Sequence, residues 1–224
     1  MPDDVELLND TEVAAVFDRL AAAHPDWDKP HVKQQNDPFR SLCAVMLSAQ
    51  SLDRNTAAAT KALFREADTP EAILELPEAR LAELIRPCGL YRNKARALKR
   101  MAADLRARFD GEVPATREAL MSLPGVGRKS ADIMLRFTFG QPVTAVDTHV
   151  HRVCNRLGLA RGKTEAQTAG ALEPRIPGAY GMSAHLLLLD HGKQVCKARK
   201  PRCETCVLVD LCRFARTGQV AKGS

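Results

Sequence analysis

Four cysteines lie close together near the end of the chain, in the spacing C-x6-C-x2-C-x5-C. They are Cys196, Cys203, Cys206 and Cys212. Disulfides here would close only small loops and add little stability, so the spacing favours a metal site. Structural zinc sites usually join two close Cys/His pairs, whereas only Cys203 and Cys206 form such a pair. The uneven spacing favours a [4Fe–4S] cluster, which is held by four cysteines, and zinc stays open as the alternative.

The segment between the first two of these cysteines is strongly basic. Four of its six residues, 197–202 (KARKPR), are Lys or Arg, whereas the whole chain has 33 basic and 27 acidic residues and a net charge of +6. On a turn clamped by a metal, such side chains are placed to contact the phosphates of a nucleic acid. We assign Arg199 and Lys200 as these contacts, whereas the basic stretch 86–108 indicates solvated helix faces.

Residues 123–129 (LPGVGRK) lie between two helical patterns. Pro124 cannot continue the first helix, and Gly125 and Gly127 permit a tight turn that an external group can approach closely. The second helix then starts with unpaired N–H groups, which suit an anion. This pattern is typical of a helix-hairpin-helix DNA-binding motif, so we assign Gly125, Val126 and Gly127 to DNA contact. A plain helix connector is the alternative.

Two residues after this turn have the chemistry of an amine nucleophile and its carboxylate partner. Lys129 starts an apolar helical pattern, so we expect partial desolvation and the helix dipole to lower its pKa. Asp147, in 146–149 (VDTH), is expected to cap the next helix. A carboxylate opposite a free amine also suits Schiff-base chemistry at a sugar carbon, because it can take a proton and stabilise positive charge.

The elements that carry these residues are expected to be helices throughout. Thr11 is a candidate cap for the first helix, residues 25–38 indicate a loop, and no alternating apolar pattern or internal repeat is found. The fold class is therefore all-α. The first expected helix runs from the Thr11 cap through Leu20 and is stopped by His24-Pro25. The others cover about 38–50, 53–66, 70–76, 78–86, 92–108, 116–121, 130–139, 147–157, 164–173 and 181–192.

The remaining cysteines and the N-terminal residues indicate the compartment. Cys43, Cys88 and Cys154 lie among apolar neighbours and are expected to be buried thiols, which implies a reducing environment. Residues 1–10 (MPDDVELLND) are acidic and lack the apolar core of a signal peptide. No apolar run reaches the length of a membrane helix. We therefore expect a cytoplasmic protein without membrane association.

The hairpin 123–131 (LPGVGRKSA), the segment 146–156 (VDTHVHRVCNR) and the four cysteines occur in the order found in a known family. Over residues 38–212 the chain resembles the endonuclease III family of DNA glycosylases. The resemblance implies two helical lobes with damaged double-stranded DNA between them. It places a six-helix barrel with the hairpin at about 31–141, and combines 1–30 with 142–224 in a four-helix lobe that carries the [4Fe–4S] cluster.

The resemblance also implies residue roles. Lys129 matches the nucleophile that attacks C1′ and forms a Schiff base, and Asp147 matches the carboxylate that assists base loss. Gln50 matches a residue that fills the gap left by the flipped nucleotide, Leu90 matches the wedge from the other side, and His149 belongs with the DNA contacts. The implied enzyme is a monomeric, bifunctional glycosylase and AP lyase with no obligate protein partner. It would remove oxidised or ring-saturated pyrimidines such as thymine glycol.

Three positions depart from better-known members of the family. Met121 stands where some relatives have an acidic residue, Asp132 where Asn is frequent, and His151 where part of the family has an aromatic residue. An adenine glycosylase acting opposite oxidised guanine is the nearest rival, but that branch generally lacks the lysine matching Lys129 and has an additional C-terminal domain. A non-catalytic DNA-binding module with a structural metal is the rival from another class.

Overall fold

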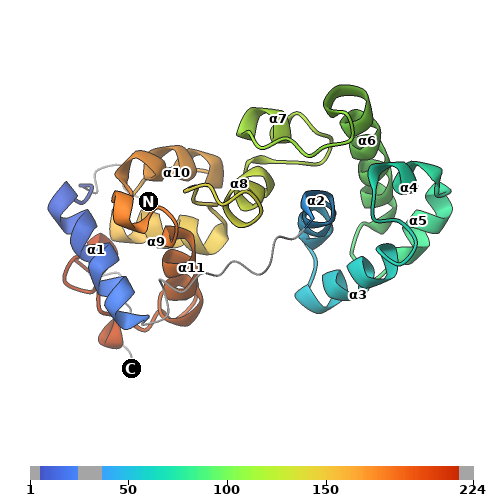
Figure 1. The fold of residues 1–224 in the computed structure, drawn as a ribbon. Helices are drawn as coiled ribbons and strands as arrows, with labels where there is room; N and C mark the ends of the chain where they lie inside the picture. Colours follow the sequence, from blue (N-terminus) through green and yellow to red (C-terminus); the bar gives the residue numbers. More distant parts are fainter. Residues whose placement is uncertain (1–5, 25–36, 217–224) are drawn as a thin grey trace. The chain divides into compact units, whose positions relative to one another are not determined.

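The computed structural model describes residues 6–24 and 37–216 (Figure 1). Within these ranges the chain forms α-helices and three short 3₁₀-helices and contains no strand, which confirms the all-α prediction. The loop expected at 25–38 falls almost entirely outside the described residues; at its end, Asp37 caps a helix that begins at Pro38. No helix in the described part of the chain is long and apolar enough to span a membrane.

The chain divides into two compact units. One combines Met1–Pro30 with Pro142–Ser224 and is called the cysteine unit below, because it contains the four clustered cysteines. The other, His31–Gln141, contains the hairpin 123–129 and is called the hairpin unit. Each unit has its own core of buried aliphatic side chains.

In the cysteine unit, the N-terminal helix packs with helices from the far end of the sequence. Helix α1 (Asp10–Ala23, blue in Figure 1) contacts α11 (Ala184–Gln194), and its buried face includes Val16 and Phe17. Its cap is Asn9 rather than the expected Thr11, because Asn9 and Glu12 form a reciprocal capping box. The other helices of this unit are α9 (Thr148–Leu157), α10 (Glu165–Leu172) and the short α12 (Arg213–Arg216).

Helices α9 and α11 approach each other very closely at Gly192. A Cβ atom at this position would lie 3.0 Å from His149 Cβ, 3.2 Å from the His149 carbonyl oxygen and 3.2 Å from Val153 Cγ2. The absent side chain therefore sets the distance between the helix that begins after Asp147 and the helix that leads into the cysteine segment. This packing fixes the start of α9 relative to Cys196.

The hairpin unit is built around one long helix. Helix α6 (Tyr91–Phe109) packs against α4 (Pro70–Glu75), α5 (Glu78–Leu84) and α2 (Pro38–Ser48). Its buried face places Leu98, Met101 and Leu105 in the core. The other helices in the described residues of this unit are α3 (Asp53–Leu63), the short α7 (Arg117–Met121) and α8 (Arg128–Phe137).

We expect Gly192→Ala to lower the free energy of unfolding by about 1–3 kcal/mol, because the added methyl group forces α11 away from α9. Gly170 is the matched control: it is also helical, and a Cβ there would meet nothing within 4 Å. Gly170→Ala should leave stability unchanged or raise it by about 0.5–1 kcal/mol. Chemical denaturation followed by circular dichroism measures both, and equal stability of the two variants would contradict the close packing.

Candidate nucleic-acid interface and metal centre

The hairpin turn is shaped by two glycines with different tasks. Gly125 has φ = +84°, and a Cβ there would lie 2.9 Å from Met46 Cε, so the turn packs tightly against α2. Gly127 is the N-cap of α8 and has no side chain to accept a hydrogen bond from the first turn. The first N–H groups of a helix have no intrahelical acceptors, so this end of α8 is suited to an external anion. Val126 is buried and its N–H donates to the Leu123 carbonyl, so it shapes the turn.

A buried carboxylate connects the two helices of the hairpin. Asp132 is 1% exposed, and its carboxylate accepts from Arg117 Nε of α7 at 2.7 Å and from Arg128 Nε of α8 at 3.1 Å. A buried charge is tolerated only when it is paired, so the two guanidinium groups compensate it. Asp132, one of the three expected departures, therefore has a structural role, because it links α7 and α8. Met121, the other departure in this unit, is exposed.

Lys129 lies on the outward side of the first turn of α8. Its side chain is exposed, whereas the buried face of the helix contains Ala131, Asp132 and Leu135. The prediction that Lys129 is partly desolvated by its own helix is wrong. At about 100° per residue, Lys129 points away from the face that Ala131 and Leu135 present to the core. The amine is instead freely presented directly after the side-chain-free cap.

Gln50 and Leu90 have an uncommon backbone conformation in common. Gln50 has φ = +51° and Leu90 has φ = +57°, and both side chains are exposed. Only four non-glycine residues in the described ranges have positive φ, and Lys200 is a third member of that group. Left-handed conformations cost roughly 1–2 kcal/mol for such residues and tend to occur at functional sites. Helix α2 ends at Ser48, two residues earlier than expected, so Gln50 lies in a turn.

Asp147 caps α9, as predicted. Its Oδ1 accepts from the backbone N–H groups of His149 and Val150, both at 2.9 Å. The ring of His149 is within 3.2 Å of Arg152 Nη2, so it is positioned from the same helix. His151 faces the other way, and its Nδ1 lies 2.8 Å from the Thr168 hydroxyl. Asp147 and His149 therefore lie together at the N-terminal end of α9. Two backbone N–H groups of this end bind the Asp147 carboxylate.

Two arginines of α9 hold the chain from the end of α11 into the basic segment 197–202. Arg152 donates to the carbonyls of Gly192 and Cys196, at 2.8 and 2.9 Å. Arg156 donates to the carbonyls of Lys197 and Ala198, at 2.7 and 3.0 Å. The sequence argument overlooked both residues, although their spacing of four in 146–156 (VDTHVHRVCNR) places them on one helix face.

This anchoring leaves Arg199 and Lys200 exposed at the tip of the segment. Lys200 has φ = +51°, so the backbone turns sharply at this point. The carbonyls on the inner side of the segment are bound to α9, whereas the two cationic side chains face solvent. The structure thus gives the segment the fixed backbone and free cations that phosphate contacts require.

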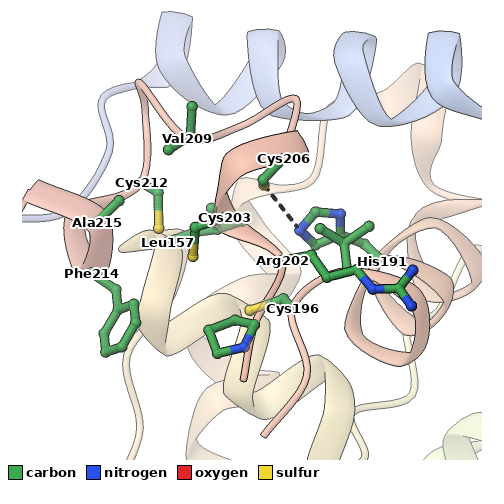
Figure 2. A pocket seen from close by; sticks show the side chains of 12 residues that line it. Leu157, His191, Cys196, Arg202, Cys203, Cys206, Val209, Cys212, Phe214 and Ala215 are labelled. Atoms are coloured by element: carbon green, nitrogen blue, oxygen red, sulfur yellow. Dashed lines mark hydrogen bonds between the residues drawn. The ribbon is translucent and has the colours of Figure 1, made fainter. Parts of the chain in front are cut away.

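The four clustered cysteines line one small pocket (Figure 2). Leu157, Val195, Val209 and Phe214 contribute to its apolar wall. Cys206 is turned toward His191, with 3.8 Å between Sγ and Nε2, and Arg156 Nη1 lies 3.6 Å from Cys196 Sγ. Among the described side chains, no three of His, Cys, Asp and Glu are grouped closely enough to hold a single metal ion.

The surroundings of these thiols fit a bound metal cluster. Burial raises the pKa of the Cys206 and Cys212 thiols, and burial lowers the pKa of His191 to about 4, so the histidine is neutral beside them. A raised pKa means that the thiolate form is unfavourable unless a positive charge lies beside it. A bound metal supplies this charge and displaces the thiol protons. Four cysteine donors around one cavity match the ligand set of a [4Fe–4S] cluster. Cys43, Cys88 and Cys154 are buried free thiols, as predicted.

The structure therefore gathers the predicted residues into two groups. In the hairpin unit, the turn with Gln50 lies beside Gly89, since a Cβ on Gly89 would be 3.6 Å from the Gln50 carbonyl oxygen. The hairpin contacts the same helix, α2, through Met46. In the cysteine unit, Asp147 and His149 share α9 with the arginines that anchor the basic segment. Lys129 and Asp147 belong to different units.

Two family models match this chain, one over the hairpin and α9 and one over the four cysteines. Residues 43–177 match the family model described as HhH-GPD superfamily base excision DNA repair protein. Residues 196–212 match the iron–sulfur binding domain of endonuclease III. This second match begins and ends at the outer cysteines of the cluster. It decides the choice between zinc and iron–sulfur that the spacing had left open, in favour of a [4Fe–4S] cluster.

Relatives of known function cover nearly the whole chain. Endonuclease III of Haemophilus influenzae is 41% identical over 208 residues, which are 92% of this chain and 97% of the relative. Endonuclease III of Treponema pallidum is 44% identical over 208 residues, 93% and 98% of the two chains. A solved structure of a trapped endonuclease III–DNA covalent intermediate matches with a TM-score of 0.84 and 38% identity, over 95% of this chain and 99% of that chain. The chain therefore belongs to the endonuclease III family of base excision DNA repair enzymes.

Proposed function

We propose that this DNA glycosylase and AP lyase removes oxidised or ring-saturated pyrimidines, with thymine glycol as the first candidate, from double-stranded DNA. We further propose that it acts as a monomer and cleaves the strand through a Schiff base on Lys129. The observation that carries the proposal is the exposed Lys129 amine beside the N-cap Gly127, where a backbone phosphate can bind. The related endonuclease III structure is a trapped covalent intermediate with DNA, which supports the same chemistry here.

The proposed reaction uses one amine and one carboxylate. The deprotonated Lys129 Nζ attacks C1′ of the damaged nucleoside, the N–C1′ bond forms, and the base leaves with the electrons of the glycosidic bond. Loss of the amine proton and opening of the sugar ring give the imine. Removal of a C2′ proton then expels the 3′ phosphate by β-elimination.

In this scheme Asp147 accepts the amine proton and stabilises the positive charge that develops on the sugar. Both hydrogen bonds of the helix cap use Oδ1, so the cap holds the carboxyl group in one orientation without requiring Oδ2. We propose that Oδ2 faces the sugar. His149, which follows Asp147 by two residues, is assigned to contact the DNA backbone nearby.

Gln50 and Leu90 are proposed to enter the duplex where the damaged nucleotide leaves it. Extrusion of a base costs a few kcal/mol, and inserted side chains offset part of this cost. The exposed, left-handed positions of both residues support these roles, since strained backbone is retained where a side chain must be presented to a ligand. Gly125, Val126 and Gly127 form the turn that is proposed to bind a phosphate on the same strand.

Cys196, Cys203, Cys206 and Cys212 are the residues that would hold the [4Fe–4S] cluster. When bound, the cluster ties these four positions together and so stabilises the segment that carries Arg199 and Lys200. The arginines of α9 also hold the start of this segment, through the carbonyls of Cys196 and Lys197. We propose that Arg199 and Lys200 bind DNA phosphates without regard to base sequence.

Replacement of the nucleophile gives the most direct test. Lys129→Ala should abolish the covalent complex that borohydride traps on duplexes with thymine glycol or an abasic site, because the imine nitrogen is lost. DNA affinity should stay within about tenfold, since one of several contacts is removed. Lys61→Ala, another exposed lysine of the hairpin unit, should trap as the wild type does. A trapped adduct in Lys129→Ala would assign the nucleophile elsewhere, and no adduct with folded wild type would refute the Schiff base.

Removal of one cluster ligand should remove the cofactor. We expect Cys203→Ser to lose visible-range absorbance and bound iron and to unfold at a lower temperature, because metal binding is coupled to folding. Cys88→Ala is the control, since Cys88 is a buried thiol of the hairpin unit. That variant should keep its full iron content. Iron analysis together with thermal denaturation distinguishes these outcomes, and a full cluster in Cys203→Ser would exclude this cysteine as a ligand.

Neutralisation of Arg199 and Lys200 together should weaken binding to all DNA sequences. The slope of log affinity against log salt should decrease by roughly 1.8, because two phosphate contacts are lost. Fluorescence anisotropy over a salt series measures this slope. Changing Lys61 and Arg65, two exposed cations of the hairpin unit, to Gln should leave it unchanged. An unaltered slope in the Arg199/Lys200 variant would exclude both residues as phosphate contacts.

A further inference from the structure

One lysine joins the end of α2 to the beginning of α6. The Lys94 ammonium donates to the backbone carbonyls of Leu47 and Ala49, each at 2.7 Å. These carbonyls lie at the C-terminal end of α2, where helix carbonyls have no intrahelical partners. The positive charge is also favourable at the negative end of the helix dipole. Lys94 thus terminates α2 directly before Gln50.

The backbone of Lys94 is bonded to the second of the two exposed positions. Its N–H donates to the Leu90 carbonyl at 3.0 Å, in the first turn of α6. Leu90 is the N-cap of this helix and has no side-chain cap hydrogen bond. This backbone bond is the ordinary first-turn bond of α6, which any residue except proline would make at this position. What Lys94 itself adds is the side-chain link from this first turn, directly after Leu90, to Ala49, next to Gln50.

The environment of Lys94 indicates a fixed contact. Its side chain is half-buried, and burial lowers the pKa of the ammonium, although the group stays well placed to donate to two carbonyls. Hydrogen bonds from charged donors are stronger than neutral ones. They are directed at the carbonyls of Leu47 and Ala49, just before Gln50, so they stabilise the turn in which Gln50 has positive φ. They also tie this turn to the first turn of α6, which follows Leu90.

We propose that Lys94 is a positioning residue that holds Gln50 and Leu90 in the arrangement in which both enter the duplex. This inference rests on the gap-filling roles proposed above. Lys94 acts on base extrusion and not on the chemistry at Lys129, since its ammonium ties the turn with Gln50 to the first turn of α6, which follows Leu90. Its importance should therefore depend on whether the DNA substrate must be opened.

Single-stranded abasic DNA provides the comparison, because no base has to leave a duplex before the imine forms. Lys94→Met removes the donors at similar length. We expect it to lower the single-turnover rate of strand cleavage on a thymine-glycol duplex by about tenfold or more. The rate of borohydride trapping on a single-stranded abasic oligonucleotide should change by less than about threefold. Lys94→Arg, which keeps a charged donor, should restore most of the duplex activity.

Lys99 offers a matched control on the same helix. Its ammonium donates to the Leu74 carbonyl at 2.7 Å, a contact of the same kind that is directed at α4 instead of the DNA-facing turns. Lys99→Met should leave both rates near those of the wild type, even if thermal stability falls to a similar extent. Should Lys94→Met not fold, Lys94→Gln, which keeps an uncharged donor, replaces it in the same comparison.

A double-mutant cycle tests whether Lys94 acts through its neighbours. In a Gln50→Ala background, Lys94→Met should slow duplex cleavage by a clearly smaller factor than in the wild type. Equal losses on duplex and single strand, an unchanged duplex rate, or the full effect of Lys94→Met in the Gln50→Ala background would each overturn the inference. Wild-type protein that traps neither substrate would refute the proposed Schiff-base function itself, so the two failures are distinguishable.

Discussion

Unpaired backbone carbonyls at the ends of helices and in loops are the constraint on which much of this structure depends. Long basic side chains of neighbouring helices supply the missing donors. Lys94 does so for α2, and Arg152 and Arg156 do so for the cysteine segment. Each bond joins a rigid helix to a loop that would otherwise be held only by its own turn. The result is that the loops proposed to contact DNA are fixed before DNA binds, which lowers the entropy that binding must overcome.

The hairpin solves the same problem with a buried carboxylate. Asp132 pairs with Arg117 from α7 and Arg128 from α8, so the two helices that flank the turn are linked by charge as well as by packing. Because the carboxylate is buried, loss of both arginines would leave its charge uncompensated. The turn has no side chain at Gly127, and the ion pairs of Asp132 with Arg117 and Arg128 join the helices on either side of it. The ion pairs of Asp132 thus link the two helices, while the backbone at Gly127 stays open to an external group.

In each unit, one helix supplies the basic side chains that hold the neighbouring loops. In the cysteine unit, α9 presents Asp147 at its N-terminal end and the half-buried Arg152 and Arg156 along its length, and Gly192 allows α11 to approach it closely. The cluster cysteines follow directly after α11, so the same packing fixes the cofactor site. In the hairpin unit, the long helix α6 gives one lysine to the α2 turn and another to α4. One helix in each unit thus acts as the support for several functional loops.

The sequence by itself determined the features that depend on local chemistry. The cysteine spacing, the two hairpin glycines, the cap at Asp147 and the buried thiols at Cys43, Cys88 and Cys154 all follow from residue type and near neighbours. Most helices were placed to within a few residues, although the first cap proved to be Asn9 and α2 ended before Gln50. Only the tertiary structure decided the exposure of Lys129, the partners of Asp132 and the carbonyl contacts of Lys94, Arg152 and Arg156. The physical reason is that a backbone carbonyl is the same in every residue, so a side chain that binds one far along the chain leaves no mark in the acceptor's sequence.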